Sequence, residues 1–361
     1  MGLGLDVRLS RLFSHASGNL FGIAVDHFVG YGNVREGGLS NLPEAVARCV
    51  SAGPDTMTMT PGTAKSCWPP HVGKASLIVQ ASYWTPDDRI RDRLATPADA
   101  VRLGADALAV AIGVRGGTEG DFIRWLSDAV RDAAPYELPV VAHIYPRDYS
   151  DEVRIVFTPE EIAYAVRVGI ETGVDVIKVG YPGDQGAFAE IIAGCPVPVV
   201  MAGGPKEPTL VGALEQMAAG LRAGARGAVV GRNIWGEDNL EHAARAYAAV
   251  LHDGVSPNER ACAACTGGAD GVGTGVPAAG EARPRPGPLA PQRCRSQDAK
   301  PPSTATRSTS WQAGQAARSA RSASRSACLR RSISSDFSLR PRAGSLRAVS
   351  SPRSCEMVHA S

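Results

Sequence analysis

Four side chains that could carry out carbonyl chemistry lie at or near the ends of apolar segments. Lys178 is enclosed by Val174-Asp-Val-Ile-Lys-Val-Gly-Tyr181, Asp26 follows Gly22-Ile-Ala-Val, and His143 and Tyr145 belong to Ala142-His-Ile-Tyr-Pro-Arg147. Burial without a close partner lowers the pKa of a lysine by up to about 3–5 units, and the neutral amine forms Schiff bases with carbonyl groups. A nearby phenol or carboxylate can transfer protons. If these side chains share one pocket, the sequence predicts catalysis through an imine on Lys178.

Alternation along each strand decides whether these side chains can meet. Successive side chains point to opposite faces, so Lys178 shares a face with Val176, and Ile177 lies on the other. If helices cover the Ile177 face, the amine points into the protein interior. By the same alternation, Tyr145 shares a face with His143.

Each of the four residues also has a purely structural interpretation. Lys178 could extend from a strand end into water, and Asp26 could cap a turn. His143 could be a hydrogen-bonded core histidine, and Tyr145 could pack with its hydroxyl at the rim. The four together favour catalysis more than any one of them does.

Glycines in two later segments indicate an anion site. Met201-Ala-Gly-Gly-Pro-Lys206 contains Gly203 and Gly204, and Val230-Gly-Arg-Asn-Ile-Trp235 contains Gly231 and Arg232. Adjacent glycines let backbone N–H groups approach an anion, and an arginine can bind phosphate with two hydrogen bonds. The structural alternative is that these glycines only permit tight turns.

The elements that must position these residues alternate regularly. Eight strands are expected at Leu20–Val25, Asp55–Met59, Ser76–Gln80, Ala107–Ile112, Pro139–Tyr145, Asp175–Val179, Val197–Met201 and Gly227–Val230. Helices are expected between and after them, at Leu42–Ser51, Pro97–Leu103, Glu119–Ala133, Pro159–Glu171, Gly186–Ile192, Thr209–Ala223 and Asn239–Leu251.

This rhythm predicts an α/β fold of the (β/α)8 TIM-barrel type, which usually takes about 250 residues. The catalytic groups of such barrels lie at the carboxyl ends of the strands, as do the residues named above. An open doubly wound sheet shows the same alternation, but no G-x-G-x-x-G follows the first strand.

Charge divides the chain in two. Residues 256–361 hold 16 Arg or Lys and 6 Asp or Glu, a net of +10, which leaves 22 and 30, a net of −8, for residues 1–255. The basic segment is rich in Arg, Ser, Ala, Pro and Gly, as in Ala317-Arg-Ser-Ala-Arg-Ser-Ala-Ser-Arg325. Such a composition buries too little apolar surface to fold. The sequence predicts a barrel domain over 1–255 and a basic, disordered, low-complexity tail over 256–361.

The tail has three interpretations. It could bind RNA or another anion, it could be a solvated appendage, or it could arise from translation in an altered reading frame of a GC-rich gene. We favour the latter two, so nucleic acid is not an expected partner.

Composition indicates the cellular compartment in which the protein is expected. No apolar run of membrane-spanning length and no signal peptide is recognised, and the eight cysteines form no disulfide framework. A lone CxxC at Cys262–Cys265 has no second pair or nearby histidine and is a weak metal or redox candidate. We expect a cytoplasmic protein without a membrane partner.

Several ordered motifs carry a family resemblance. Ala24-Val-Asp-His27, Lys178-Val-Gly-Tyr-Pro-Gly-Asp184, Pro198-Val-Val-Met-Ala-Gly-Gly-Pro-Lys206 and Gly231-Arg-Asn-Ile-Trp235 resemble the archaeal-type class I fructose-bisphosphate aldolases. That family also holds amino-dideoxyheptulosonate-type synthases and the phosphorylated autoinducer-2 thiolase. The resemblance covers about residues 20–250 and none of the tail.

The resemblance implies a role for each site residue. Lys178 would form the Schiff base, Asp26 would assist proton transfer, and Tyr145 would be the acid/base for carbon–carbon cleavage. The phosphate of the substrate would bind at Gly203, Gly204, Gly231 and Arg232.

Two positions depart from the family pattern. Phe28 replaces the usual glycine after Asp-His, and His143 replaces a tryptophan that the aldolases often carry. His143 could therefore serve as an additional base, and the sugar specificity of the standard aldolase need not apply.

We therefore expect a class I aldehyde-lyase that cleaves or forms a C–C bond in a phosphorylated ketose, such as fructose 1,6-bisphosphate, without a metal or other cofactor. An acyl- or aldol-transfer enzyme of the same family is the first alternative, and a non-catalytic sugar-phosphate-binding barrel is the second. A sugar phosphate is the expected partner, together with further copies of the chain in a homo-oligomer.

Overall fold

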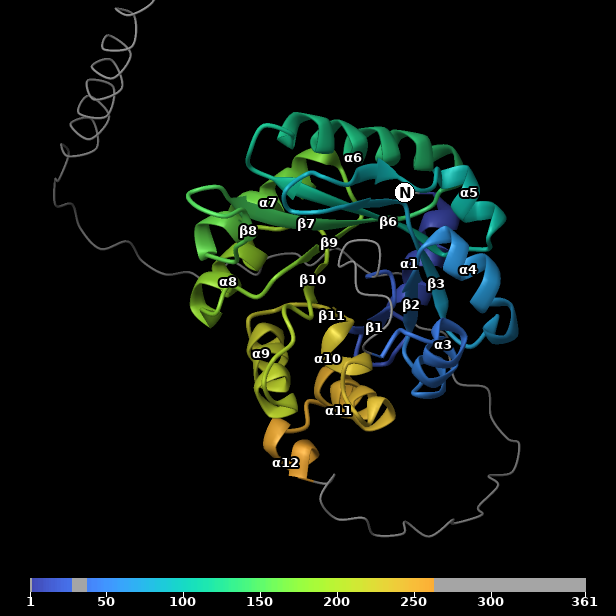
Figure 1. Ribbon diagram of the computed structural model, residues 1–361, viewed down its shortest axis with the longest axis vertical. Helices are drawn as coiled ribbons and strands as arrows, with labels where there is room; N and C mark the ends of the chain where they lie inside the picture. The colour runs from blue at the N-terminus through green and yellow to red at the C-terminus, as the bar shows by residue number, and fades with distance from the viewer. Residues whose placement is uncertain (1, 28–37, 263–361) are drawn as a thin grey trace, which may run out of the picture. The chain divides into compact units, whose positions relative to one another are not determined.

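The computed structural model describes residues 2–27 and 38–262, which belong to one compact unit, Met1–Gly273. In this described part, eight parallel strands form a closed barrel (Figure 1). Their order around the barrel is β1 (Leu20–Ala24), β2 (Thr56–Met59), β3 (Ser76–Gln80), β6 (Ala107–Val114), β7 (Val140–Asp148), β9 (Val176–Val179), β10 (Val199–Ala202) and β11 (Gly227–Val230).

Closure settles the fold class. β6 pairs in parallel with β7, and β11 pairs in parallel with β1, so the sheet of parallel strands has no free edge. The predicted (β/α)8 barrel is confirmed, and the doubly wound alternative is excluded. The strands lie where the sequence pattern placed them, with small shifts at their ends.

The predicted helices surround the strands (Figure 1). They are α3 (Leu42–Ser51), α5 (Pro97–Arg102), α6 (Glu119–Ala133), α7 (Pro159–Thr172), α8 (Gln185–Ala193), α9 (Leu210–Arg222) and α11 (Leu240–Asp253). Several further elements were not predicted from the sequence pattern. They are α1 (Leu3–Leu12), α4 (Pro61–Cys67), α10 (Arg232–Trp235), α12 (Pro257–Cys262), the short helices Pro69–His71 and Ala134–Tyr136, and the strands β4 (Ser82–Trp84), β5 (Arg91–Arg93) and β8 (Arg154–Ile155).

Local sequence explains where the helices begin and end. Thr158 caps α7 by accepting a hydrogen bond from the backbone N–H of Glu161, and Pro159 occupies the first helical position. Gly173 ends the same helix at φ 78°, a left-handed conformation that glycine adopts without steric cost. These local signals set the two ends of α7.

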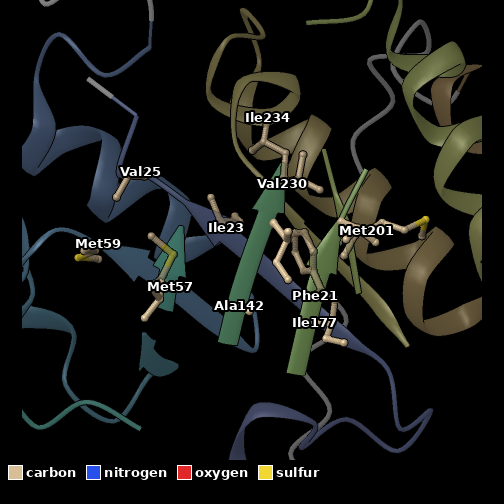
Figure 2. Close-up of a cluster of buried hydrophobic side chains, with 14 of the residues drawn as sticks. Phe21, Ile23, Val25, Met57, Met59, Ala142, Ile177, Met201, Val230 and Ile234 are labelled. Atoms are coloured by element: carbon tan, nitrogen blue, oxygen red, sulfur yellow. The ribbon is translucent and has the colours of Figure 1, made fainter. Parts of the chain in front are cut away.

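Each barrel strand buries both faces. The inner face contributes a compact cluster that includes Ala24, Val141 and Val176. The outer face packs under the helices, and Figure 2 shows part of this layer, with Phe21, Ile23, Val25, Met57, Met59, Ala142, Ile177, Met201, Val230 and Ile234 labelled. Ile177 therefore lies beneath the helices, and Lys178 belongs to the inner face, as alternation predicted.

Helix α1 covers the interior of the barrel. Leu12 is fully buried in the inner cluster, and Leu9 and Phe13 pack against the same cluster. The strand residues of this cluster include Leu20 and Val176, which lie at the amino ends of β1 and β9. The apolar interior is thus shielded at that end, and the carboxyl ends are left for the pocket described below.

Some expectations fall outside the described residues. Phe28 is one of them, as is the predicted tail from residue 263 onward. Helix α12 extends beyond residue 255, where the sequence analysis placed the end of the barrel domain. Among the helices of the described residues, none is both long and apolar enough to cross a membrane.

Candidate active site

A cavity of about 290 Å³ lies at the carboxyl ends of the barrel strands. All of the site residues that the sequence analysis named line it: Asp26, His143, Tyr145, Lys178, Gly203, Gly204, Gly231 and Arg232. These residues come from five strands or the turns after them, so the closed barrel brings together groups far apart in the chain. Their predicted convergence is therefore observed.

Lys178 presents a buried amine to this cavity. The residue is 4% exposed on β9, and its neighbours in the parallel register are His143 on β7 and Val200 on β10. Burial lowers the pKa of Lys178 to about 8, against the opposing effect of the Asp26 carboxylate. The amine is therefore neutral in a usable fraction of molecules near neutral pH, which nucleophilic attack on a carbonyl requires.

Asp26 is held in its ionised form. Burial by itself raises the pKa of this carboxyl, but the hydrogen bond from His27 and the positive charges of His27 and Lys178 outweigh burial and lower the pKa well below its ordinary value. His27 Nδ1 lies 3.1 Å from Asp26 Oδ1, and Gln80 Nε2 donates a hydrogen bond of 3.0 Å to Oδ2. The carboxylate is thus a fixed negative charge beside the Lys178 amine.

His143 is buried and neutral. It is 2% exposed, and burial lowers its pKa well below 6.5, with a further decrease from the charge of Lys178. Its Nδ1 lies 3.3 Å from Gln80 Nε2. A histidine with so low a pKa is a weak base, which counts against the role of an additional base that the sequence left open for it.

Tyr145 lies at the outer part of the same wall. Its ring is half-buried and packs against Trp84, with ring centroids 6.2 Å apart. The phenol belongs to the inner face of β7, two residues beyond His143. The phenol therefore lines the same cavity as the Lys178 amine.

The two glycine segments, which follow β10 and β11, form another part of the wall. Gly204 has φ +70°, and a Cβ built on Gly231 would lie 2.5 Å from the His27 ring, so a side chain at either position would be strained or would clash. Arg232 Nη2 donates a hydrogen bond of 3.1 Å to the carbonyl oxygen of Gly204. Gly231 makes room for the His27 ring, and both glycines leave bare backbone in the cavity wall.

Asn233 joins the two glycine segments, and the sequence analysis missed it. Its Nδ2 donates to the carbonyl oxygens of Gly203 at 2.7 Å and Pro205 at 2.8 Å, and its Oδ1 accepts from the N–H of Glu207 at 2.8 Å. The side chain is 1% exposed. It fixes the loop after β10 against the start of α10.

Gln80 was also missed, although it ends a strand that the sequence predicted correctly. Alternation from Ile78, a member of the inner cluster, places Gln80 on the inner face of β3. That signal could have identified it as a pocket residue. Its contacts to Asp26 and His143 depend on which strands are neighbours in the closed barrel, and sequence alone does not reveal them.

Arg147, the last residue of the Tyr-Pro-Arg motif, holds together the rim of the pocket. It is 2% exposed, and its guanidinium donates to Asp88 Oδ1 at 2.9 Å, Thr118 Oγ1 at 2.9 Å and the Arg115 carbonyl at 2.7 Å. It also lies over the Trp84 ring. Arg147 therefore ties the β4–β5 hairpin, which carries Trp84, to the ends of β6 and β7.

No group of three His, Cys, Asp or Glu side chains in the described part of the chain is arranged to hold a metal ion. The amine, carboxylate and phenol of the pocket suit imine chemistry on a carbonyl compound.

Comparison with known proteins agrees with this chemistry. An uncharacterised aldolase of Saccharolobus solfataricus is 30% identical over 272 residues, covering 71% of this chain and 97% of that protein. A 2-amino-4,5-dihydroxy-6-oxo-7-(phosphonooxy)heptanoate synthase of Streptomyces griseus is 33% identical over 239 residues, covering 63% of this chain and 83% of that protein.

Solved structures give the same result. An archaeal fructose-1,6-bisphosphate aldolase, whose catalytic lysine is covalently bound to the carbinolamine intermediate of the substrate, superposes with a TM-score of 0.61 at 32% identity. The match covers 69% of this chain and 99% of that one. The family model of the DeoC/LacD aldolases matches residues 21–237. The chain therefore belongs to the DeoC/LacD family of aldolases.

Proposed function

We propose that this protein is a class I aldolase that cleaves or forms a C–C bond in a phosphorylated ketose through an imine on Lys178. The observation that carries the proposal is a buried amine, with its pKa lowered to about 8, beside an ionised carboxylate in a cavity at the carboxyl ends of the strands. At pH 7 about 10% of such an amine is neutral, against about 0.03% at a pKa of 10.5.

The proposed reaction begins when Lys178 Nζ attacks the carbonyl carbon of the ketose. Nζ gives up one proton, and the former carbonyl oxygen takes up two protons in all and leaves as water, so an iminium forms. Asp26, the carboxylate beside Nζ, is the group proposed to relay these protons. In the cleavage direction, Tyr145 removes the proton of the hydroxyl beyond the breaking bond. The bonding electrons move into the iminium, an aldehyde leaves, and the resulting enamine is protonated and hydrolysed.

The phosphate is proposed to bind at Gly203, Gly204, Gly231 and Arg232. The support is the close approach that Gly204 and Gly231 allow and the position of Arg232 in the cavity wall. From β11 and β10, which these segments follow, the next strands around the barrel are β9, with Lys178, and β7, with Tyr145. A ketose phosphate anchored here can extend past Lys178 toward Tyr145.

Borohydride trapping tests the proposal. With dihydroxyacetone phosphate and borohydride, intact-mass spectrometry should show one reduced adduct, and peptide mapping should place it on Lys178. Lys178→Met should abolish the adduct, and Lys74→Met, a matched change at an exposed lysine, should leave it unchanged. Trapping that survives Lys178→Met, or ligand binding without an adduct or turnover, would contradict the mechanism and favour a non-catalytic sugar-phosphate-binding barrel.

A second candidate is aldol transfer onto an acceptor that carries no phosphate. The cavity wall near Tyr145 includes Trp84, Pro86, Ile155 and Phe157, and no Lys or Arg of the described residues lies in that part of the lining. Enzyme loaded with dihydroxyacetone phosphate should be offered glyceraldehyde phosphate, aspartate semialdehyde and acetyl-coenzyme A, from which coenzyme A would leave, in turn. The preferred acceptor separates a lyase from a synthase or thiolase.

Homo-oligomer formation and a cytoplasmic location stay predictions. Light scattering after size-exclusion chromatography of the full chain measures the oligomeric state directly.

A further inference from the structure

The orientation of the Gln80 side-chain amide follows from its contact with Asp26. The Gln80 atom 3.0 Å from Asp26 Oδ2 must be a donor, because an ionised carboxylate only accepts hydrogen bonds. That atom is therefore the amide nitrogen. The amide oxygen, Oε1, is buried and accepts no hydrogen bond from any described residue.

The same amide nitrogen fixes the tautomer of His143. It lies 3.3 Å from His143 Nδ1 and has a second hydrogen to donate, so Nδ1 is the acceptor. A neutral imidazole that accepts at Nδ1 carries its proton on Nε2. This Nε2–H group is buried and has no hydrogen-bond partner among the described residues.

A donor and an acceptor of the cavity wall are thus left without a protein partner. His143 supplies the N–H, Gln80 supplies the oxygen, and both residues line the cavity. Burying such groups unpaired costs free energy, and they are usually satisfied by water or a ligand. A hydroxyl group fits both because it accepts one hydrogen bond and donates another. A carboxylate or phosphate fits poorly, because it cannot donate to Gln80 and would lie near the Asp26 charge.

The position of the pair relative to Lys178 limits which hydroxyl it can bind. His143 and Lys178 are register partners on neighbouring strands and share the inner face, and neighbouring strands lie about 4.8 Å apart. Both side chains therefore face the same part of the cavity, and an oxygen bound by His143 Nε2 belongs to a substrate atom close to the carbon attached to Lys178.

We infer that His143 and Gln80 form a recognition site for a free hydroxyl group on the carbon next to the imine carbon. The substrates are then phosphorylated α-hydroxyketones, and ketone phosphates that lack this hydroxyl are rejected. The inference rests on the proposed imine chemistry of Lys178. His143 acts in it as a hydrogen-bond donor that determines specificity.

The test compares dihydroxyacetone phosphate with hydroxyacetone phosphate, which differs only in lacking the free hydroxyl. The concentration dependence of borohydride trapping on the full chain gives an apparent affinity for each ketone without requiring turnover. Wild-type protein should favour dihydroxyacetone phosphate by about tenfold or more, because the deoxy compound leaves the buried N–H unpaired.

Two matched variants separate the donor from its surroundings. The amide nitrogen of His143→Gln reaches the former place of Nε2 and should preserve most of the preference. His143→Asn is similarly polar but reaches only the place of Nδ1, and should reduce the preference to about twofold by weakening dihydroxyacetone phosphate alone. Gln80→Met keeps the length of the side chain but removes the amide, so it should also reduce the preference for dihydroxyacetone phosphate. His242→Phe on α11, another histidine with a buried Nε2 that has no partner among the described residues, is the control outside the pocket and should change nothing.

The outcomes distinguish this inference from the proposed function. If neither ketone forms an adduct in any protein, the imine mechanism fails, and the inference fails with it. If both ketones form adducts on Lys178 and His143→Asn keeps the wild-type preference, only the hydroxyl site is wrong. Equal trapping of both ketones by the wild-type protein would also show that the hydroxyl site is wrong and leave the imine mechanism standing. Circular dichroism of each variant confirms that the compared proteins are folded.

Discussion

His143 on β7 and Lys178 on β9 are direct partners in the parallel register, and both point into the barrel. Burial lowers the pKa of both side chains, and the positive charge of Lys178 lowers that of His143 further. Asp26 opposes both decreases with its single negative charge. Lys178 and His143 therefore share the negative charge of one buried carboxylate, which His27 also contacts at 3.1 Å, and the stronger base, Lys178, holds the proton.

Imine formation should depend on pH through Lys178. The neutral amine is the nucleophile, so the rate of adduct formation at low ketone concentration should rise with pH and level off above about 8, the lowered pKa of the amine. Stopped-flow measurement with dihydroxyacetone phosphate gives this profile. A rate that still rises near pH 10 would show an unperturbed lysine.

Replacing Asp26 should move that profile to lower pH. The Asp26 carboxylate raises the pKa of Lys178, so Asp26→Asn leaves burial unopposed and the pKa decreases. The amine should then react faster at pH 6 with a β-diketone that forms a coloured adduct with neutral amines, although turnover of the sugar phosphate falls. Asp184→Asn, at the N-cap of α8, is the control and should leave the profile unchanged. A shift to higher pH would contradict the electrostatic role of Asp26.

The buried charge of Lys178 should lower the free energy of unfolding of the barrel at neutral pH. Its pKa falls from 10.5 to about 8, so between these values the unfolded chain binds more protons, and the stability of the wild type rises with pH across this window. Below pH 8 the cost is fully present and amounts to up to about 3 kcal/mol. Lys178→Met should therefore have the higher free energy of unfolding at pH 7.

Urea denaturation of both proteins at pH 7 and at pH 10 checks this. The advantage of Lys178→Met should shrink as the pH approaches 10.5, because the wild-type amine is then neutral in the folded state and about half neutral in the unfolded chain. Effects of other titrating groups cancel in the difference. An advantage that is absent at pH 7, or that grows with pH, would mean that the lysine is not buried as a cation.

The parts of the site that the sequence predicted depend on local periodicity. The inward direction of Lys178 follows from Ile177 facing the helices, and the shared face of His143 and Tyr145 follows from their spacing. Barrel closure then brings the strand ends together without further information. For this reason all named site residues line one cavity.

The parts that it missed depend on long-range contacts or on an irregular pattern. Gln80 meets Asp26 and His143 only because β3 lies in a closed barrel with β1 and β7. Helix α1 was overlooked because its apolar residues do not mark one buried face: Leu12 is fully buried, but Leu3 is 78% exposed. The strand β5 is Arg-Asp-Arg and pairs only with β4, so no apolar alternation marks it.

Asn233 should control phosphate affinity without touching the imine. Asn233→Asp removes the donor that binds the Gly203 and Pro205 carbonyl oxygens and sets a carboxylate against them. We expect the KM of a ketose phosphate to rise about tenfold or more, and trapping of unphosphorylated dihydroxyacetone on Lys178 to stay at the wild-type level. Asn239→Asp, at the N-cap of α11 where Asp caps equally well, should change neither value. Equal loss with both ketones would show that Asn233 supports the whole site.

Arg147 should be essential to the pocket rim through its shape as well as its charge. Arg147→Lys keeps a cation, but a lysine cannot reach Asp88, Thr118 and the Arg115 carbonyl from one rigid plane. These groups then lose hydrogen bonds that no other donor among the described residues replaces. The free energy of unfolding should therefore fall by about 3–5 kcal/mol. Arg154→Lys is the matched control, since its ion pair with Asp148 is exposed to solvent, and it should change stability by less than about 1 kcal/mol.

The Arg147→Lys protein should also separate the two halves of the proposed reaction. Arg147 lies over Trp84, and Trp84 packs against Tyr145, so the loosened rim no longer holds the phenol in place. Lys178 is on a different strand and keeps its surroundings. At a temperature where the variant is folded, borohydride trapping should persist while C–C cleavage slows, as with Tyr145→Phe. If trapping is lost together with cleavage, Arg147 stabilises the barrel core and has no separate effect on the rim.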